Sequence, residues 1–179
     1  MREDSNGVIT AQWLIDNLKL KPLPREGGYY RETYKNRGEI PGDALPARYG
    51  GARSFSTAIY YLLTPDTCSA IHRVRSDEIF HFYLGDPVTM LLLYMDSSSE
   101  VVTLGNRPHL GQHPQYMVPR GVWQGCILSP GGRFALMGTT VAPGFEFDDY
   151  EHGCREELLR TYPHQEDLVN RLLKQQESQ

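Results

Sequence analysis

The sequence predicts an all-β barrel or sandwich with short helices near its N- and C-terminal ends. Between about residues 27 and 150, short β-prone runs recur with turn signals between them, which is typical of barrels and sandwiches. Two of these runs, 56–63 and 88–95, are apolar on both faces, as expected for a wall that is covered on both sides. Helical periodicity is found only before and after this region.

The first predicted element is a helix over residues 11–18. Thr10 precedes it, and a threonine hydroxyl at this position accepts a hydrogen bond from an amide of the first turn. Trp13, Leu14 and Leu18 share one helical face. The helix is expected to end before residues 21–24, because the two prolines there cannot continue it.

The predicted strands fill the middle of the chain. Clusters of Gly, Pro, Asp and Ser separate them, and such clusters mark turns. Residues 38–51 are rich in Gly and Pro and are expected to form a loop. The strands are expected over residues 29–34, 56–63, 70–74, 78–84, 88–95, 101–104, 115–118, 123–128 and 134–141.

Two further helices are predicted after the strands, over residues 156–160 and 165–173. Tyr162-Pro163 separates them. Leucines recur at helical spacing on one side of each helix, and an apolar stripe of this kind packs on a hydrophobic surface. These helices are therefore expected to cover the barrel.

Composition bounds the class of protein. The 179 residues suit a single domain over residues 1–179, with 40% apolar and 22% charged residues. The net charge is −4 and the basic residues are scattered, which disfavours a nucleic-acid partner. Residues 1–7 are polar and the longest apolar run, Met90 to Met95, is too short for a bilayer, so we expect a cytoplasmic protein without membrane association. Three cysteines without CxxC spacing are expected to be free, buried thiols.

The most distinctive motif joins a histidine to a glutamate six residues later. His72 is followed by Val74, by Glu78 and, after six more residues, by Gly85. This arrangement resembles the first motif of the cupin superfamily, which reads H-x-H, three or four residues, E, six residues, G. The later run of residues 119–124, Pro-Arg-Gly-Val-Trp-Gln, resembles the second cupin motif, P-x-G-x-x-H.

Four segments in the same order are similar to one branch of that superfamily, the cupin-5 or DUF985 family. They are residues 27–34, 56–63, 72–87 and 141–147, and the resemblance extends over about residues 10–163. It implies a double-stranded β-helix, the cupin jelly-roll barrel, which is usually dimeric. It implies no settled activity.

The resemblance also implies a metal site, but with two departures. Typical metal cupins use two histidines of the first motif, the glutamate and a histidine of the second, and here Val74 and Gln124 stand at two of these positions. The remaining metal candidates are His72, Glu78 and Gln124, a weaker set than the three good ligands of most catalytic sites. We expect no certain cofactor, with a weakly bound divalent metal as the alternative.

His72 and Glu78 are expected to face one pocket inside the barrel. The other side chains expected to bind a ligand there are Phe80, Phe82, Trp123 and Gln124. Side chains alternate along a strand, so His81, three residues after Glu78, is expected on the outer face. The histidines in loops and in the tail, His152 among them, are expected to be solvated.

The leading hypothesis for function is a pocket that binds a small polar, sugar-like molecule. In its enzyme version His72, supported by Glu78, removes a proton next to a carbonyl, as in metal-free sugar epimerases of the same superfold. A tyrosine would act from the other face, and the candidates are Tyr29, Tyr30, Tyr34, Tyr60 and Tyr61. The alternatives are a metal-dependent isomerase or oxygenase and a non-catalytic small-molecule-binding dimer.

A homodimer is expected from the wall of the barrel. The runs 56–63 and 88–95 are apolar on both faces, whereas a lone barrel exposes one face of its wall to water. An apolar outer face marks an association site, and two-fold dimers are the commonest way to bury one.

Overall fold

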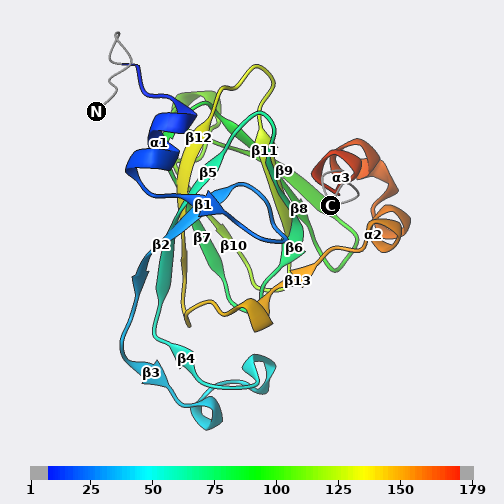
Figure 1. Ribbon diagram of the computed structural model, residues 1–179. Coiled ribbons are helices and arrows are strands. Elements are labelled where there is room, and N and C mark those ends of the chain that lie inside the picture. Colours follow the sequence, from blue (N-terminus) through cyan, green and yellow to red (C-terminus); the bar gives the residue numbers. More distant parts are fainter. Residues whose placement is uncertain (1–7, 174–179) are drawn as a thin grey trace.

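The protein is described by a computed structural model over residues 8–173, in which two antiparallel sheets face each other (Figure 1). Residues 1–7, whose polar composition contributes to the cytoplasmic expectation, lie outside the described residues. The six-stranded sheet has the order β1 (Lys21–Pro22), β2 (Tyr29–Lys35), β5 (Thr57–Leu63), β12 (Ala135–Val141), β7 (Glu78–Gly85), β10 (Gln115–Val118). The five-stranded sheet has the order β13 (Glu151–His152), β6 (Cys68–Arg73), β11 (Trp123–Leu128), β8 (Val88–Leu93), β9 (Ser99–Leu104).

The all-β prediction and its strands are confirmed. Every strand predicted between residues 29 and 141 is present, with ends within two residues of the prediction. The strands that the sequence did not indicate, β1, β13 and the hairpin of β3 (Glu39–Ile40) and β4 (Arg53–Ser54), are two residues long. Such short pieces carry too few residues for an alternating pattern, so tertiary pairing alone defines them.

The main hydrophobic core lies between the two sheets. Alternating residues of each strand point inward, so that Phe80 and Phe82 of β7 meet Met90 and Leu92 of β8 across the interior. Odd-numbered neighbours such as His81 and Tyr83 point outward and are half-buried or exposed. The period of two therefore separates core from surface along β7, as the sequence predicts.

The three predicted helices are confirmed and cover the outer faces of both sheets (Figure 1). Helix α1 (Ala11–Asn17), capped by Thr10, packs Leu14 against Leu62 and Leu136 of the six-stranded sheet. Helices α2 (Arg155–Thr161) and α3 (Glu166–Leu173) cover the five-stranded sheet, and their leucines enclose Leu91 and Leu93.

This cover corrects the reason for expecting a dimer. Leu62, Leu91 and Leu93, three outward residues of the two doubly apolar runs, are at most 1% exposed within one chain, whereas Tyr60 is half-buried and Met95 is 89% exposed. Helices of the same chain therefore bury much of the apolar faces that the sequence left without a partner. The amphipathic helices and the doubly apolar strands are two halves of the same contact.

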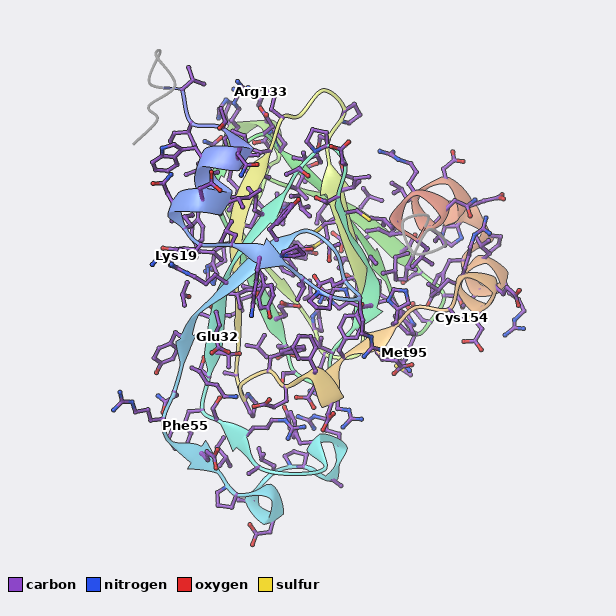
Figure 2. The ribbon with its side chains drawn as sticks, viewed as in Figure 1. Lys19, Glu32, Phe55, Met95, Arg133 and Cys154 are labelled. Atoms are coloured by element: carbon purple, nitrogen blue, oxygen red, sulfur yellow. The ribbon has the colours of Figure 1, made fainter. Side chains whose placement is uncertain are left out.

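Cysteine burial is only partly as expected. Cys68 and Cys126 are free and buried, but Cys154 is exposed and lies just before α2 (Figure 2). Among residues 8–173, no helix combines the length and the apolar character that crossing a membrane requires.

A buried ion pair fastens the β3–β4 extension to the barrel. Arg53 of β4 donates from Nε and Nη2 to the two carboxylate oxygens of Asp149, at 2.8 and 2.6 Å. Both side chains are buried. Asp149 ends the short 3-10 helix Phe147–Asp149, so this pair fixes the segment that leads from β12 to β13.

Shortening Leu172 tests the cover over the five-stranded sheet. Leu172→Ala removes a fully buried side chain from the contact between α3 and the sheet, and is expected to lower the free energy of unfolding by about 2–5 kcal/mol. Leu110→Ala is the control, because Leu110 is 63% exposed. Urea unfolding measures both, and an equal effect of the two changes would mean that α3 does not cover the sheet.

Candidate functional site

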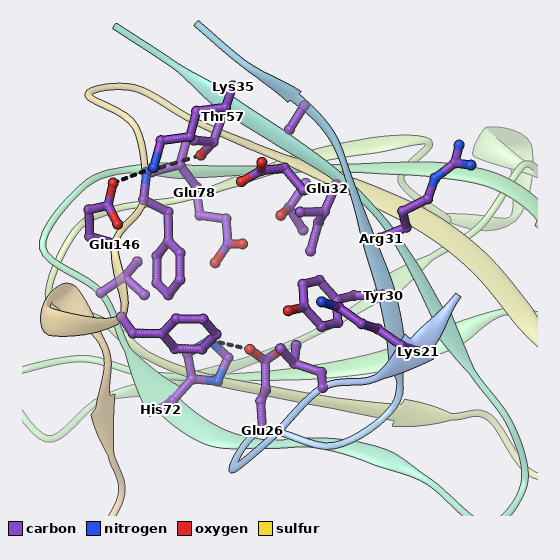
Figure 3. Close-up of a pocket in the computed structure, with 18 residues that line it drawn as sticks. Lys21, Glu26, Tyr30, Arg31, Glu32, Lys35, Thr57, His72, Glu78 and Glu146 are labelled. Atoms are coloured by element: carbon purple, nitrogen blue, oxygen red, sulfur yellow. Dashed lines mark hydrogen bonds and ion pairs between the residues drawn. The ribbon is translucent and has the colours of Figure 1, made fainter. Parts of the chain in front are cut away.

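A cavity of about 360 Å³ opens between the two sheets. Its walls are formed by β2, β5, β7 and β12 of the six-stranded sheet, by β6 of the five-stranded sheet, and by the segments 21–26 and 145–147. Figure 3 shows Glu26, Tyr30, His72 and Glu78 directed toward the same space. The structure therefore brings His72 and Glu78 together in one cavity, as expected.

Strand register accounts for this meeting. His72 of β6 lies opposite Gln124 of β11, and Glu78, the first residue of β7, lies opposite Val141 of β12. Val74 lines the cavity with His72 because residues two apart share a face. The position where the first cupin motif has its second histidine thus faces the cavity in this chain as well.

The imidazole of His72 is held in one orientation. Its Nδ1 lies 2.8 Å from the carbonyl oxygen of Ala70, and because a carbonyl only accepts, Nδ1 carries the hydrogen. The ring also stacks on Tyr150 with the centroids 5.0 Å apart. In the neutral ring Nε2 therefore carries the lone pair, which lies 3.5 Å from Gln124 Nε2 and 4.0 Å from Glu26 Oε2.

Glu26 is a site residue that the sequence analysis missed. It lies in the loop between β1 and β2, and its Oε1 accepts a hydrogen bond of 2.7 Å from Ser69 Oγ. Gly28 has φ +71° and approaches Leu62 and Tyr61 so closely that a Cβ would lie 2.9 Å from their atoms. The sequence does contain a sign of this position. The Gly27-Gly28 pair allows a close turn, and that turn brings the carboxylate of the preceding residue, Glu26, to the cavity.

Glu78 is buried beside Gln124, whose Nε2 donates to Glu78 Oε2 at 2.6 Å. Burial raises the pKa of the Glu78 carboxyl, the nearby His72 lowers it, and Glu26 raises it further. Gln124 is 1% exposed, and its Oε1 has no hydrogen-bond partner among the described residues. Contrary to expectation, Gln124 does not line the cavity; it lies behind His72 and Glu78 and contacts both.

The aromatic wall differs from the one expected. Phe80 and Phe82 belong to the core between the sheets and do not line the cavity. Trp123 points away from it, because Gln124 is its neighbour on β11 and adjacent residues face opposite sides; Arg73 lies 4.4 Å from its ring centroid. The aromatic residues that line the cavity are Tyr30, Phe145 and Phe147.

One of the five candidate tyrosines lines the cavity. Tyr30 does so from β2, and its hydroxyl points into the space between Glu26 and Glu78 (Figure 3). Tyr29 and Tyr60 pack in the outer cluster with α1, and Tyr61 donates to a backbone carbonyl. Tyr34 is exposed on the surface.

His81 and His152 were both expected outside the cavity, and the structure shows where each lies. His81 lies on the outer face as predicted, 3.0 Å from Thr140 Oγ1. His152 is not simply solvated: it is half-buried on β13, pairs in register with His72, and its Nδ1 lies 3.0 Å from the Tyr150 hydroxyl. Burial lowers the pKa of His152, and the charges of His72 and Arg25 lower it further.

The donor set does not fit a first-row transition metal. Gln124 presents its amide nitrogen to both His72 and Glu78, and a nitrogen that donates to a carboxylate does not coordinate a metal. Among residues 8–173, no group of three His, Cys, Asp or Glu side chains is arranged to hold a metal ion. We therefore derive no chemistry through a metal at this site.

The rim of the cavity carries mixed charge. Lys35 of β2 and Glu146 form an ion pair with Nζ and Oε1 2.6 Å apart, which joins the two sides of the opening. The ammonium group of Lys21 lies 5.2 Å from the ring centroid of Tyr30. The basic groups thus lie at the exposed edge, whereas Glu26 and Glu78 lie further in.

Comparison with known proteins agrees with this architecture. The family described as Cupin superfamily (DUF985) matches residues 12–153. An uncharacterized protein of Saccharomyces cerevisiae is 32% identical over 161 residues, which cover 84% of this chain and 79% of that one.

Solved structures extend the comparison. A hypothetical protein from Leishmania major has a TM-score of 0.81 at 30% identity, and a protein from Shewanella oneidensis has a TM-score of 0.81 at 32% identity. Both matches cover 92% of this chain and 98% of the other. Oxalate decarboxylase from Bacillus subtilis, with a TM-score of 0.50 at 12% identity over 87% of this chain and 38% of that one, shares the fold alone.

The buried carboxyl of Glu78 predicts a pH-dependent stability. Because its pKa in the folded protein lies above the ordinary 4.5, the folded state takes up a proton before the unfolded state does as the pH falls. Relative to Glu78→Gln, the wild type should therefore gain stability from neutral pH down to 4.5, by about 1.4 kcal/mol per unit of pKa elevation.

Urea unfolding across this pH range measures the difference between the two proteins. Glu157→Gln, at an exposed position on α2, is the control and should differ from the wild type by a constant amount. A difference for Glu78→Gln that stays constant, or grows in the opposite direction, would contradict the raised pKa.

Proposed function

The chain belongs to the DUF985 family of the cupin superfamily, and we propose that its cavity binds a small polar, sugar-like molecule and transfers a proton on it. The observation that carries the proposal is the orientation of His72. Its Nδ1 hydrogen is committed to Ala70, so Nε2, with only a long 3.5 Å contact to Gln124 Nε2, is the nitrogen that can accept a proton from a ligand in the cavity. Tyr30, from the opposite sheet, supports the same reaction from another side.

The proposed step is proton transfer next to a carbonyl group. His72 Nε2 removes a hydrogen ion from the carbon beside the carbonyl, and the electron pair of that C–H bond moves to form an enolate. Tyr30 then delivers its hydroxyl proton to the same carbon from the other face, and exchange with solvent restores both residues. The net result is inversion at that carbon without oxidation or reduction.

The surrounding groups support this assignment. After the transfer His72 is a cation, and the carboxylates of Glu26 and Glu78 stabilise it. Thr57 Oγ1 accepts a hydrogen bond of 3.0 Å from the amide of Phe145, which leaves its own hydrogen for an enolate oxygen. A cavity of about 360 Å³ is within the usual range for a small ligand.

Isotope exchange tests the proposal. The protein should catalyse incorporation of deuterium from D₂O next to the carbonyl of at least one member of a panel of keto-sugars, free and nucleotide-linked. His72→Gln should lower the exchange rate about 100-fold or more, and Tyr30→Phe should lower the rate of inversion, followed by NMR, by a similar factor, a typical contribution of an acid or base. Mass spectrometry measures the exchange.

Matched controls use the outer face of the same barrel. His81→Gln and Tyr29→Phe change the same residue types outside the cavity and should leave exchange unaffected. Equal losses in all four variants would point to damage of the fold. Absence of exchange across the whole panel would favour the alternative, a cavity that binds a small molecule without catalysis.

A symmetric homodimer is a second proposal, through exposed apolar residues on the outer face of the six-stranded sheet. Trp13, Tyr83 and Met117 are 42%, 47% and 49% exposed on the outer face of the six-stranded sheet. Trp13 and Tyr83 line one shallow groove there, and Met117 lies opposite Ile79, one strand over, on the side of β7 that carries Tyr83. Exposed apolar residues that share one face in this way favour association.

Light scattering over a wide concentration range is expected to give twice the 20.4 kDa mass of the chain. Met117→Glu should shift the protein toward the monomer, because it places a charge in the apolar surface. Leu110→Glu, at an exposed position of the short 3-10 helix Pro108–Leu110, is the control. A wild-type monomer at every concentration would rule out this interface.

A further inference from the structure

We propose that the ligand of this cavity carries a primary ammonium group, which binds at the inner end between Glu26 and Glu78. The inference rests on the proposed function in that a small molecule binds here. It goes further by naming the chemical class of the group that the inner end recognises.

The inner end offers acceptors and almost no free donors. Ser69 Oγ donates to Glu26, Gln124 Nε2 donates to Glu78, and the Nδ1 hydrogen of His72 is committed to Ala70. What remains toward the cavity is the second carboxylate oxygen of Glu26 and the carboxylate of Glu78, beside His72 Nε2, which Gln124 Nε2 approaches to 3.5 Å. A group with several N–H donors satisfies this arrangement, whereas a carbonyl or carboxylate does not.

The charge of the inner end points the same way. Two carboxylates and a neutral imidazole sum to −2, and one added proton still leaves −1. Three basic residues line the cavity, but Lys35 pairs with Glu146 at the exposed edge, Lys21 lies over the ring of Tyr30 and Arg31 lies over the ring of Tyr60, so all three are engaged elsewhere. A cation is therefore attracted to the inner end, and an anion is repelled.

The aromatic walls suit the same ligand. The rings of Phe145 and Phe147 meet edge to face with centroids 5.4 Å apart, and Tyr30 lines the opposite side. The faces of aromatic rings attract cations and also pack against the apolar face of a ring or sugar. Carboxylates beside aromatic rings are thus complementary to an ammonium group on a compact apolar or ring-shaped body.

A divalent metal is the competing cation. A metal needs a set of ligands around one point, and among the described residues no three His, Cys, Asp or Glu side chains are so arranged. An ammonium group has three directed hydrogens and tolerates acceptors that are several ångströms apart.

Three probes of similar shape test the inference: benzylamine, benzyl alcohol and benzoate. Calorimetric titration in the presence of a chelator should show benzylamine binding at least about tenfold more tightly than benzyl alcohol, since hydrogen bonds to charged groups are the stronger ones. Benzoate should show no binding. Benzoate binding as tightly as benzylamine, or equal binding of all three, would overturn the inference.

Glu26→Gln supplies the matched variant. Glu26 lies in a loop and is partly exposed, so the change spares the core of the barrel. It should weaken benzylamine about tenfold and leave benzyl alcohol unchanged. Glu157→Gln on α2 should alter neither. If Glu26→Gln fails to fold, a competition of MnCl₂ with benzylamine on the wild type decides: displacement by stoichiometric Mn²⁺ would assign the inner end to a metal.

These outcomes are distinct from those of the exchange experiment. Deuterium exchange into neutral keto-sugars together with no benzylamine binding would leave the proton-transfer proposal standing and refute the ammonium group. Benzylamine binding without exchange would support the ammonium group in a cavity that binds but does not catalyse.

Discussion

The burial of three polar side chains between two β-sheets is the constraint on which the site depends. His72, Glu78 and Gln124 are all at most 8% exposed, and buried polar groups destabilise a fold unless they find partners. Much of the local structure supplies those partners. The carbonyl of Ala70 takes the Nδ1 hydrogen of His72, Gln124 donates to Glu78, and the ring of Tyr150 covers the imidazole.

The segments that enclose the cavity are also held by polar side chains that need partners. The β1–β2 loop brings Glu26 to the cavity and is fastened by the bond from Ser69, a residue 43 positions away in the chain. The segment after β12 is fastened by the buried pair of Arg53 and Asp149, which sets the path from Phe147 to Tyr150. Ser69, Arg53 and Asp149 do not line the cavity, so the cavity is shaped in part by residues that do not contact a ligand in it.

The sequence predicts those features of the fold and the site that depend on residues close together in the chain. The strands, the helices, and the shared orientation of His72 and Glu78 follow from local periodicity and a spaced motif, and the structure confirms them. Glu26, Phe145 and Phe147 lie in loops, where no period relates a residue to a face, so only the tertiary path reveals them. Trp123 was expected in the cavity, but the alternation of side chains along β11 argues against this. Because Gln124 faces inward, its neighbour on the strand faces outward.

The two departures from the usual cupin ligands change what the cavity complements. Val74 faces the cavity where a histidine would add a metal ligand, and Gln124 offers an N–H where another histidine would offer a lone pair. Glu78 thus stands at the usual position but without the positive charge that a bound metal would provide. A single amide donor does not neutralise the negative charge of a buried carboxylate. Glu26 adds a second carboxylate nearby, which raises the pKa of Glu78 and increases the imbalance. A cavity that retains its acids after its metal ligands are replaced is complementary to a positive charge delivered by the ligand itself.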